Sequence, residues 1–429
     1  MKPSRVVVSA GCAALCLAAA PTVAYAAGGS LDPSFGSGGV VSTAYTGPAP
    51  TDALLQPDGK IVVVTGFSND PGATQAFGLL RYQASGALDT TFGAAGRTST
   101  AFTDFLNYAN DAVLQPDGKI IVVGEAESAD GTLSEFAIAR FTATGALDTT
   151  FGAGGKVTTN FVGVMPGGVS NPATTVLVQP DGKILVGGSA SQCPRNCGPR
   201  RTALARYTQN GALDTTFGTG GMVSVVAIGQ VSTLAEDAAG HIFALAGAQI
   251  AEFTPTGTQQ SQITPAPVVT SSSGGFQVTP ALFQPDGRYV VATGAADGTS
   301  GYRHDVDAVV TRYQQIGVVD PTFSNPPFDF GTEAPNATDL AQGIAQQANG
   351  QVVLVGYSSV NGTTTFTAAR LTATGALDTT FGSGGTLTVD VGGGQGSTVL
   401  TQPDGKILVV GQGFVNGATT LVLARYLAQ

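Results

Sequence analysis

The segment ARYTQNGALDTTFG, from Ala205 to Gly218, contains a motif that recurs along the chain. Its second half, ALDTTFG, is found unchanged at residues 87–93, 146–152 and 376–382. A related stretch, LDPSFG, begins at Leu31 with no ARY before it, and the chain ends in LARYLAQ with no LDTTFG after it. The sequence is therefore built from repeats, and its two ends carry complementary halves of one unit.

A second motif, QPDG, marks the period of the repeat. It occurs five times, and the stretches EDAAG and QQANG are weaker copies of it. A period of about 58 residues matches a β-propeller blade better than a helical solenoid. The seven motif glycines are Gly59, Gly118, Gly182, Gly240, Gly287, Gly350 and Gly405.

Each unit contains four short β-rich runs, here called strands a to d, separated by turn residues. Within residues 110–160, the run KIIVVG has four consecutive apolar residues after its Lys. Such a continuous apolar run is typical of a strand buried on both faces. Pro-Asp-Gly before it favours a tight turn. We predict an all-β fold, a seven-bladed β-propeller of four-stranded antiparallel blades. Residues Leu31 to Tyr45 then supply the fourth strand of the last blade, whose first three strands lie in Ser397 to Leu427, and close the ring.

The composition excludes some classes of partner. The net charge is −10 and only 11% of the residues are charged, so a nucleic acid or an anionic membrane surface is not expected to bind. Lys2 and Arg5 precede an apolar run that ends before the small-x-small site at Ala26. We predict a signal peptide at 1–26 and a secreted propeller at 27–429, in the medium or the cell envelope, with no membrane span.

Removal of this leader leaves two cysteines, Cys193 and Cys197, in the sequence CPRNC. An even pair in an exported chain predicts a disulfide, here a clip on one surface loop. A metal site is disfavoured, because the two histidines, His241 and His304, lack metal-ligand spacing to this pair. We expect no metal and no cofactor.

The signatures LQPDGKI-VVG and ARY-x3-GALDTTFG resemble those of the bacterial delta-60 repeat proteins, β-propellers of unknown function. The resemblance covers nearly the whole mature chain. It implies the architecture and no activity. WD40 and kelch repeats are disfavoured because the chain has no Trp, whereas NHL-type propellers remain an alternative.

An Arg stands eight residues before an Asp in five units, and both residues change together in the fourth unit, to Glu252 and Gln260. Such joint loss predicts ion pairs, since an unpaired buried partner would be costly. Arg425 has no Asp after it and is expected to pair with Asp32. A ring of catalytic carboxylates is the alternative. The five pairs are Arg81–Asp89, Arg140–Asp148, Arg206–Asp214, Arg312–Asp320 and Arg370–Asp378.

The Phe of LDTTFG also recurs once in most units. We expect it to fill the wedge between neighbouring blades, and stacking on a ligand is the alternative. The positions are Phe35, Phe92, Phe151, Phe217, Phe323 and Phe381.

The variation of the loops between units predicts which face of the propeller binds a ligand. In a meander the a–b and c–d turns share one face and repeat closely, whereas the b–c and d–a loops share the other and vary. The loop at residues 302–307 is the densest polar cluster, for which a catalytic or calcium role is an alternative to a solvated loop. The small polar residues eight positions before each motif glycine are candidates for the rim of the central channel: Thr51, Asn110, Thr174, Ser232, Thr279, Gln342 and Ser397. The predicted ligand-binding residues are Tyr108, Tyr302, His304, Asp305 and Tyr357.

Two function classes follow. No Ser-His-Asp, HExxH or paired-His motif is visible, which favours a secreted non-catalytic recognition or scaffold propeller over an enzyme. It would bind a glycan or an envelope protein through the variable-loop face, as a monomer. The alternative is a secreted lyase or hydrolase with its site in the central funnel.

Overall fold

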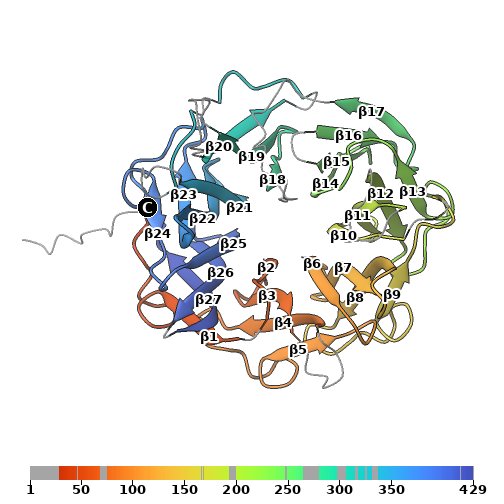
Figure 1. Ribbon diagram of the computed structural model, residues 1–429, viewed down its shortest axis with the longest axis horizontal. Coiled ribbons are helices and arrows are strands. Elements are labelled where there is room, and N and C mark those ends of the chain that lie inside the picture. Colours follow the sequence, from red (N-terminus) through yellow and green to blue (C-terminus); the bar gives the residue numbers. More distant parts are fainter. Residues whose placement is uncertain are drawn as a thin grey trace, which may run out of the picture.

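The computed structural model describes residues 29–45, 47–67, 75–165, 167, 169–192, 200–246, 249–263, 280–296, 306–314, 317–323, 326–330, 337–415 and 417–428. These residues form seven blades arranged as a ring, and the chain visits the blades in order (Figure 1). The predicted seven-bladed β-propeller is therefore confirmed. No helix in the described ranges is long and apolar enough to cross a membrane.

Each blade begins with its inner strand and proceeds outward. Blade 1 contains β2 (Asp52–Leu55), β3 (Ile61–Gly66), β4 (Phe77–Tyr82) and β5 (Arg97–Thr100). Blade 2 contains β6 (Asn107–Leu114), β7 (Ile120–Glu127), β8 (Ser134–Phe141) and β9 (Lys156–Thr159). Blade 3 contains β10 (Ala173–Val178), β11 (Ile184–Ala190), β12 (Arg201–Tyr207) and β13 (Met222–Val225). Blade 4 contains β14 (Thr233–Glu236), β15 (Ile242–Ala246), β16 (Gln249–Phe253) and β17 (Gln259–Ile263).

The remaining blades complete the ring. Blade 5 contains β18 (Ala281–Phe283), β19 (Tyr289–Ala296) and β20 (Val306–Tyr313). Blade 6 contains β21 (Thr338–Gln346), β22 (Val352–Val360), β23 (Thr363–Leu371) and β24 (Thr386–Thr388). Blade 7 contains β25 (Gly394–Thr401), β26 (Ile407–Val415), β27 (Ala418–Tyr426) and, from the other end of the chain, β1 (Val40–Ala44).

Blade 5 departs from the repeat. Among the described residues its fourth-strand position is represented by a single bridge between Ala308 and Phe328. Strand β20 also pairs with β21 in parallel through Val306 and Thr338, which joins blades 5 and 6 into one sheet.

The two ends of the chain close the ring as predicted. Strand β1 pairs antiparallel with β27, from Val40 opposite Ala424 to Ala44 opposite Thr420. The backbone N–H of Asp32 donates to the carbonyl of Arg425 at 2.7 Å. Blade 7 is thus a four-stranded sheet whose outer strand comes from the N-terminal end.

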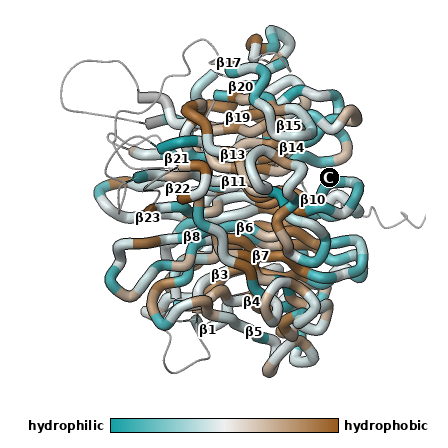
Figure 2. Tube along the Cα trace, turned by 90° about the vertical axis from the view of Figure 1, so that its right-hand side faces the viewer, coloured by the Kyte–Doolittle hydropathy of each residue, from teal (hydrophilic) through white to brown (hydrophobic). Residues whose placement is uncertain are grey.

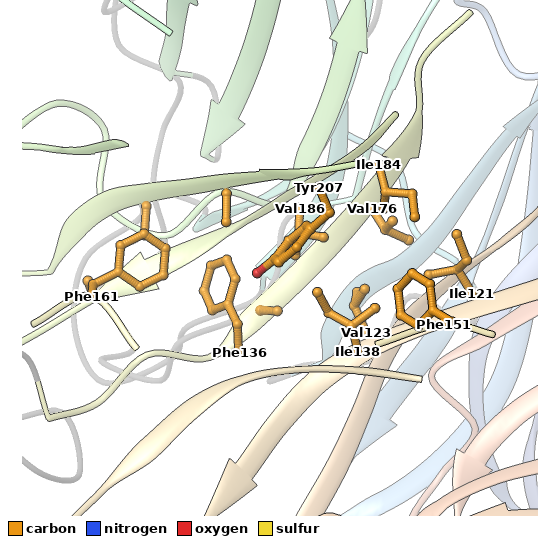
Figure 3. Close-up of a cluster of buried hydrophobic side chains, with 14 of the residues drawn as sticks. Ile121, Val123, Phe136, Ile138, Phe151, Phe161, Val176, Ile184, Val186 and Tyr207 are labelled. Carbon is orange, nitrogen blue, oxygen red and sulfur yellow. The ribbon is translucent and has the colours of Figure 1, made fainter. Parts of the chain in front are cut away.

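Apolar wedges between blades form the core. Hydrophobic residues concentrate in strands such as β3, β4 and β7 (Figure 2). Between blades 2 and 3, Ile121, Val123 and Phe136 pack against Val186 and Tyr207 in one buried cluster (Figure 3). Because each wedge is filled from both sides, every blade depends on its neighbours for burial of its apolar faces.

The repeated Arg, Asp and Phe form a latch at the c–d turn of each blade that has them. The Arg Nε lies 2.8 Å from the Asp Oδ2 in five blades, and 2.9 Å away in the pair Arg425–Asp32. The guanidinium carbon lies 4.5 to 4.7 Å from the centroid of the Phe ring. In five of these six latches the Arg also donates to a backbone carbonyl in the turn of the next blade, at Ala143, Gln209, Pro255, Ala373 and Ala84.

The Arg and Thr partners of the latch Asp residues keep these carboxylates ionised. Burial opposes ionisation of Asp148, but the hydroxyl and N–H of Thr150 and the charge of Arg140 outweigh it and lower its pKa to about 2. Because each of these Asp residues has its own Arg, the carboxylates are structural, and in five blades the Arg also links its blade to the next.

Candidate functional site

A cavity of about 430 Å³ lies between blades 2 and 3, on the face of the b–c and d–a loops. Its walls come from the ends of β6 and β7, the loop that joins β7 to β8, the segment before β10, and the residue that precedes β12. The polar side chains in these walls are Tyr108, Glu125, Glu127, Thr132, Ser134, Ser170 and Arg200.

The alternation of β7 places two glutamates in this cavity. Ile121 and Val123 point into the apolar wedge shared with blade 3. Since side chains on a strand repeat with a period of two residues, Glu125 and Glu127 continue the same face beyond the end of the apolar core. The strand thus changes from apolar to acidic where the wedge opens toward solvent.

Cross-strand pairing adds two more groups to this face. Tyr108 on β6 lies directly opposite Glu125, and Ser134 on β8 lies directly opposite Glu127. Side chains in such positions are about 5 Å apart at their Cβ atoms. The hairpins of blade 2 therefore hold a phenol, a hydroxyl and two carboxylates together on a rigid sheet.

Blade 3 contributes the cation. Arg200 is held in place by donating Nη1–H to Ser189 Oγ at 3.1 Å and to the side-chain oxygen of Gln230. Burial lowers the pKa of Arg200, and the negative charge of Glu125 opposes this. The cavity thus has one wall from each of two blades, with opposite charges on the two walls.

The environment favours the protonated form of one glutamate. Burial raises the pKa of Glu125, and the charge of Glu127 raises it further, although Ser134 and Arg200 act in the opposite direction. Burial and the charges of Glu127 and Glu125 also raise the pKa of the Tyr108 hydroxyl. A carboxyl group whose pKa is raised beside a second carboxylate is suited to general acid catalysis.

The structure places the other predicted site residues elsewhere or does not describe them. Tyr108 lines the cavity, but Tyr357 lies half-buried on β22 of blade 6, opposite Leu340 and Phe366. Tyr302, His304 and Asp305, the pair Cys193 and Cys197, and the leader at 1–26 lie outside the described residues.

Two of the predicted rim residues, Asn110 and Thr174, join neighbouring blades, whereas the Ser232 hydroxyl donates to the carbonyl of Leu245 in its own blade. Asn110 Nδ2 donates to the carbonyl of Ala173 at 2.7 Å, and the hydroxyl of Thr174 donates to the carbonyl of Val231. These two side chains therefore bond to backbone carbonyls at or just before the inner strand of the next blade. Among the described residues, no three His, Cys, Asp or Glu side chains converge as a metal site.

A second pair of carboxylates lies on the inner strands. The N–H of Ala112 donates both to Asp52 Oδ2 at 3.2 Å and to Asp111 Oδ1 at 2.9 Å, so these carboxyl groups of blades 1 and 2 are adjacent. Asp111 Oδ2 accepts a further bond from the N–H of Val176 in blade 3 at 2.8 Å. Burial raises the pKa of both groups, and the charge of Asp111 raises that of Asp52 further. Adjacent, partly buried carboxyls of this kind share a proton.

This pair gives a prediction for stability against pH. The folded state holds a proton that the unfolded chain releases near pH 4, so the free energy of unfolding falls as the pH rises from about 4 through the raised pKa values. Asparagine at position 52 keeps an oxygen for Ala112 and offers Asp111 a neutral donor. We expect Asp52→Asn to stabilise the protein by about 1 kcal/mol at about pH 8 and to change little at about pH 4, in thermal unfolding. Equal destabilisation at both pH values would contradict the shared proton.

A comparison of sequences identifies the repeats. The family model "Domain of unknown function (DUF5122) beta-propeller" matches residues 56–92, 115–151, 179–217, 347–381 and 402–429. The matched stretches make up less than half of the chain and are consistent with a β-propeller repeat family. No curated protein is significantly similar to it in sequence.

Solved structures of similar fold include several enzymes. A polysaccharide lyase, Uly1, has a TM-score of 0.47 and 11% identity, covering 89% of this chain and 90% of its own. An α-L-arabinanase of Penicillium chrysogenum bound to arabinobiose has a TM-score of 0.40 and 11% identity, covering 89% and 98%. A GH93 α-L-arabinofuranosidase of Fusarium graminearum bound to arabinobiose has a TM-score of 0.40 and 9% identity, covering 93% and 96%.

These neighbours correct the function predicted from the sequence. A non-catalytic recognition or scaffold propeller was favoured because no catalytic motif is visible, but the similar propellers are glycoside hydrolases and a polysaccharide lyase, the class named as the alternative. The physical reason is that a site built between two blades needs no contiguous motif. The similarity concerns the fold alone, so the chemistry of this chain has to be argued from its own cavity.

Sequence reasoning missed Glu125, Glu127 and Arg200 as site residues. Each occurs once, in a loop or at a strand end that varies between units. The available signal was the pattern of β7, where Glu125 and Glu127 occupy successive positions of the face that is apolar at Ile121 and Val123.

Proposed function

We propose that this chain is an exported glycoside hydrolase that cleaves a polysaccharide in the cavity between blades 2 and 3. The observation that carries the proposal is the pair Glu125 and Glu127 on one face of β7, one of them with a raised pKa. Cleavage of a glycosidic bond needs one protonated carboxyl and one ionised carboxylate. Glu125 donates the proton to the leaving oxygen, and Glu127, on the same face of β7, acts as base or nucleophile.

Hydrolysis is favoured over elimination by the state of Tyr108. A lyase needs a base that removes a proton from the sugar ring carbon, and the phenolate of a tyrosine can serve as such a base. Burial and two nearby carboxylates raise the pKa of Tyr108, which disfavours its phenolate. In this site Tyr108 therefore serves as a hydrogen-bonding group and an aromatic wall.

The rest of the cavity suits a sugar. Leu106 and Leu133 offer apolar surface, and the side chain of Leu133 is half exposed at the rim. Arg200 presents its guanidinium from the facing blade, where it can bind a ring hydroxyl. The location between two blades differs from the central funnel expected for an enzyme from the sequence.

The proposal places the enzyme outside the cell. This proposal is supported by the basic residues Lys2 and Arg5, the apolar run after them and the small-x-small site at Ala26. The cysteine pair Cys193 and Cys197 also suits an oxidising compartment. The LDTTFG and QPDG motifs support assignment of the repeats to the delta-60 type.

The test is a screen of neutral and acidic polysaccharides with two readouts. We expect the wild-type protein to release reducing ends from at least one polysaccharide, and the Glu125→Gln variant to release none above background. A lyase would instead form an unsaturated product with a characteristic ultraviolet absorbance. Formation of that product at an undiminished rate by Glu125→Gln would overturn the assignment.

A further inference from the structure

Blade 4 is the blade that lacks the latch. Glu252 occupies the position of the Arg and Gln260 that of the Asp, and the stacked Arg–Phe pairs of the described residues all belong to the other six blades. The ranges matched by the family model also end at residue 217 and resume at residue 347, so they omit blades 4 and 5. The wedge between these two blades is therefore built differently from the rest.

The loss of the latch leaves space in this wedge. Two cavities of about 290 and 440 Å³ adjoin, because both are lined by Asp237, Phe243 and Ile250. Glu252 lies directly opposite Phe243 in the ladder of β15 and β16, as Arg206 lies opposite Leu185 in blade 3. The Glu252 carboxylate thus lies in a cavity at the register position from which other blades extend a guanidinium.

Aromatic rings form one wall of this space. The centroids of Phe243 and Phe283 are 6.3 Å apart, and those of Phe283 and Tyr289 are 5.8 Å apart. Tyr289 lines the smaller cavity and is fully buried, yet its hydroxyl has no hydrogen-bond partner in the described part of the chain. A buried hydroxyl left without a partner is costly, which points to a ligand that supplies one.

The other wall is acidic. Asp237 and Glu252 line this side, whereas the carboxylate of Glu236 is directed toward blade 3, where its Oε1 accepts a hydrogen bond from Gln179 Nε2 at 3.0 Å. The basic group in this lining is His241, whose Nδ1 lies 3.0 Å from Asp237 Oδ2. Glu252 Oε2 accepts a bond from the Ser261 hydroxyl at 2.9 Å and has its other oxygen for a ligand. The site offers hydrogen-bond acceptors, negative charge and aromatic faces together.

We propose that the wedge between blades 4 and 5 binds the guanidinium group of an external ligand, in place of the arginine that this blade has lost. A guanidinium is planar, stacks on aromatic rings and donates to several acceptors at once. It would lie against Phe243 and Phe283 and donate to Glu252. The Tyr289 hydroxyl accepts a further N–H. The group belongs either to a free small molecule or to an arginine side chain of a peptide.

Calorimetric titration with matched probes tests the chemistry. We expect ethylguanidinium to bind and the neutral isostere ethylurea not to bind, while ethylammonium binds more weakly because it cannot stack as a plane. A short peptide with a central arginine, compared with the same peptide carrying citrulline, distinguishes the two sources. Failure of both the small guanidinium and the arginine peptide to bind would overturn the proposal.

Variants locate the site. Glu252→Gln and Tyr289→Phe should each weaken ethylguanidinium binding, the former by about tenfold or more. The double variant Glu252→Arg, Gln260→Asp restores the Arg and Asp of the latch. It should abolish binding while raising the melting temperature, which shows that it folds. Binding to this double variant at wild-type affinity would refute the assignment. Glu125→Gln should bind the probe normally, which keeps this test independent of the proposed hydrolase.

Discussion

Deletion of residues Leu31 to Tyr45 is expected to cause aggregation and a large loss of thermal stability. The deletion removes β1, so the outer edge of β27 is left unpaired and open to association with other chains. It also removes Phe35, which is fully buried, and the carboxylate that pairs with Arg425. The loss of that carboxylate alone should destabilise the fold by about 3 to 5 kcal/mol, because it leaves a buried arginine without its counter-ion.

Size-exclusion chromatography and thermal unfolding of the truncated and intact proteins measure this effect. A matched pair of point variants separates ring closure from the local ion pair. Asp32→Asn breaks the latch that joins the two ends of the chain, and Asp89→Asn breaks the equivalent latch within blade 1. Both point variants should lose stability by similar amounts and stay monomeric, whereas only the deletion should aggregate. A monomeric truncated protein with unchanged melting would contradict the closed ring.

The fold could be predicted from the sequence because repetition makes local signals reliable. Each copy of PDG, KI-VVG and LDTTFG is a weak indication by itself, but the motifs recur in a fixed order and the two ends complement each other. The fourth strand of blade 5 was the exception. Its unit keeps the motif Arg312 and Asp320, and the described residues there form a bridge at Phe328 in place of a strand.

The candidate site could not be predicted in the same way, because its residues occur once. Glu125 and Arg200 come from different blades, and their proximity depends on the register of β7 and on the packing of the two sheets. The inner pair Asp52 and Asp111 likewise occupies a position that holds Thr175 in the next blade. Repetition identifies the scaffold, whereas a departure from repetition indicates where chemistry is possible.

Replacement of the two cavity glutamates is expected to have the largest effect on activity. Glu125→Gln removes the proton donor, and Glu127→Gln removes the second carboxylate, which acts as base or nucleophile. Each should lower kcat by about 10²- to 10⁴-fold with a smaller change in KM, measured by release of reducing ends. Glu135→Gln is the matched control, because Glu135 lies on the same hairpin, next to Ser134, and bonds to Asn160 outside the cavity. A normal rate for Glu125→Gln would exclude this site.

The pH profile distinguishes a catalytic acid from a residue that only shapes the cavity. Glu125 acts in its protonated form, so activity should fall as the pH rises through its raised pKa. The alkaline limb of the pH profile should therefore report the ionisation of Glu125. The charge of Arg200 lowers the pKa of Glu125. Arg200→Gln should therefore shift the alkaline limb to higher pH, while Glu135→Gln leaves it in place. If Arg200 only shapes the cavity, Arg200→Gln will lower the rate at every pH and leave the alkaline limb of the profile where it is. That result would contradict the assignment of Glu125 as the general acid.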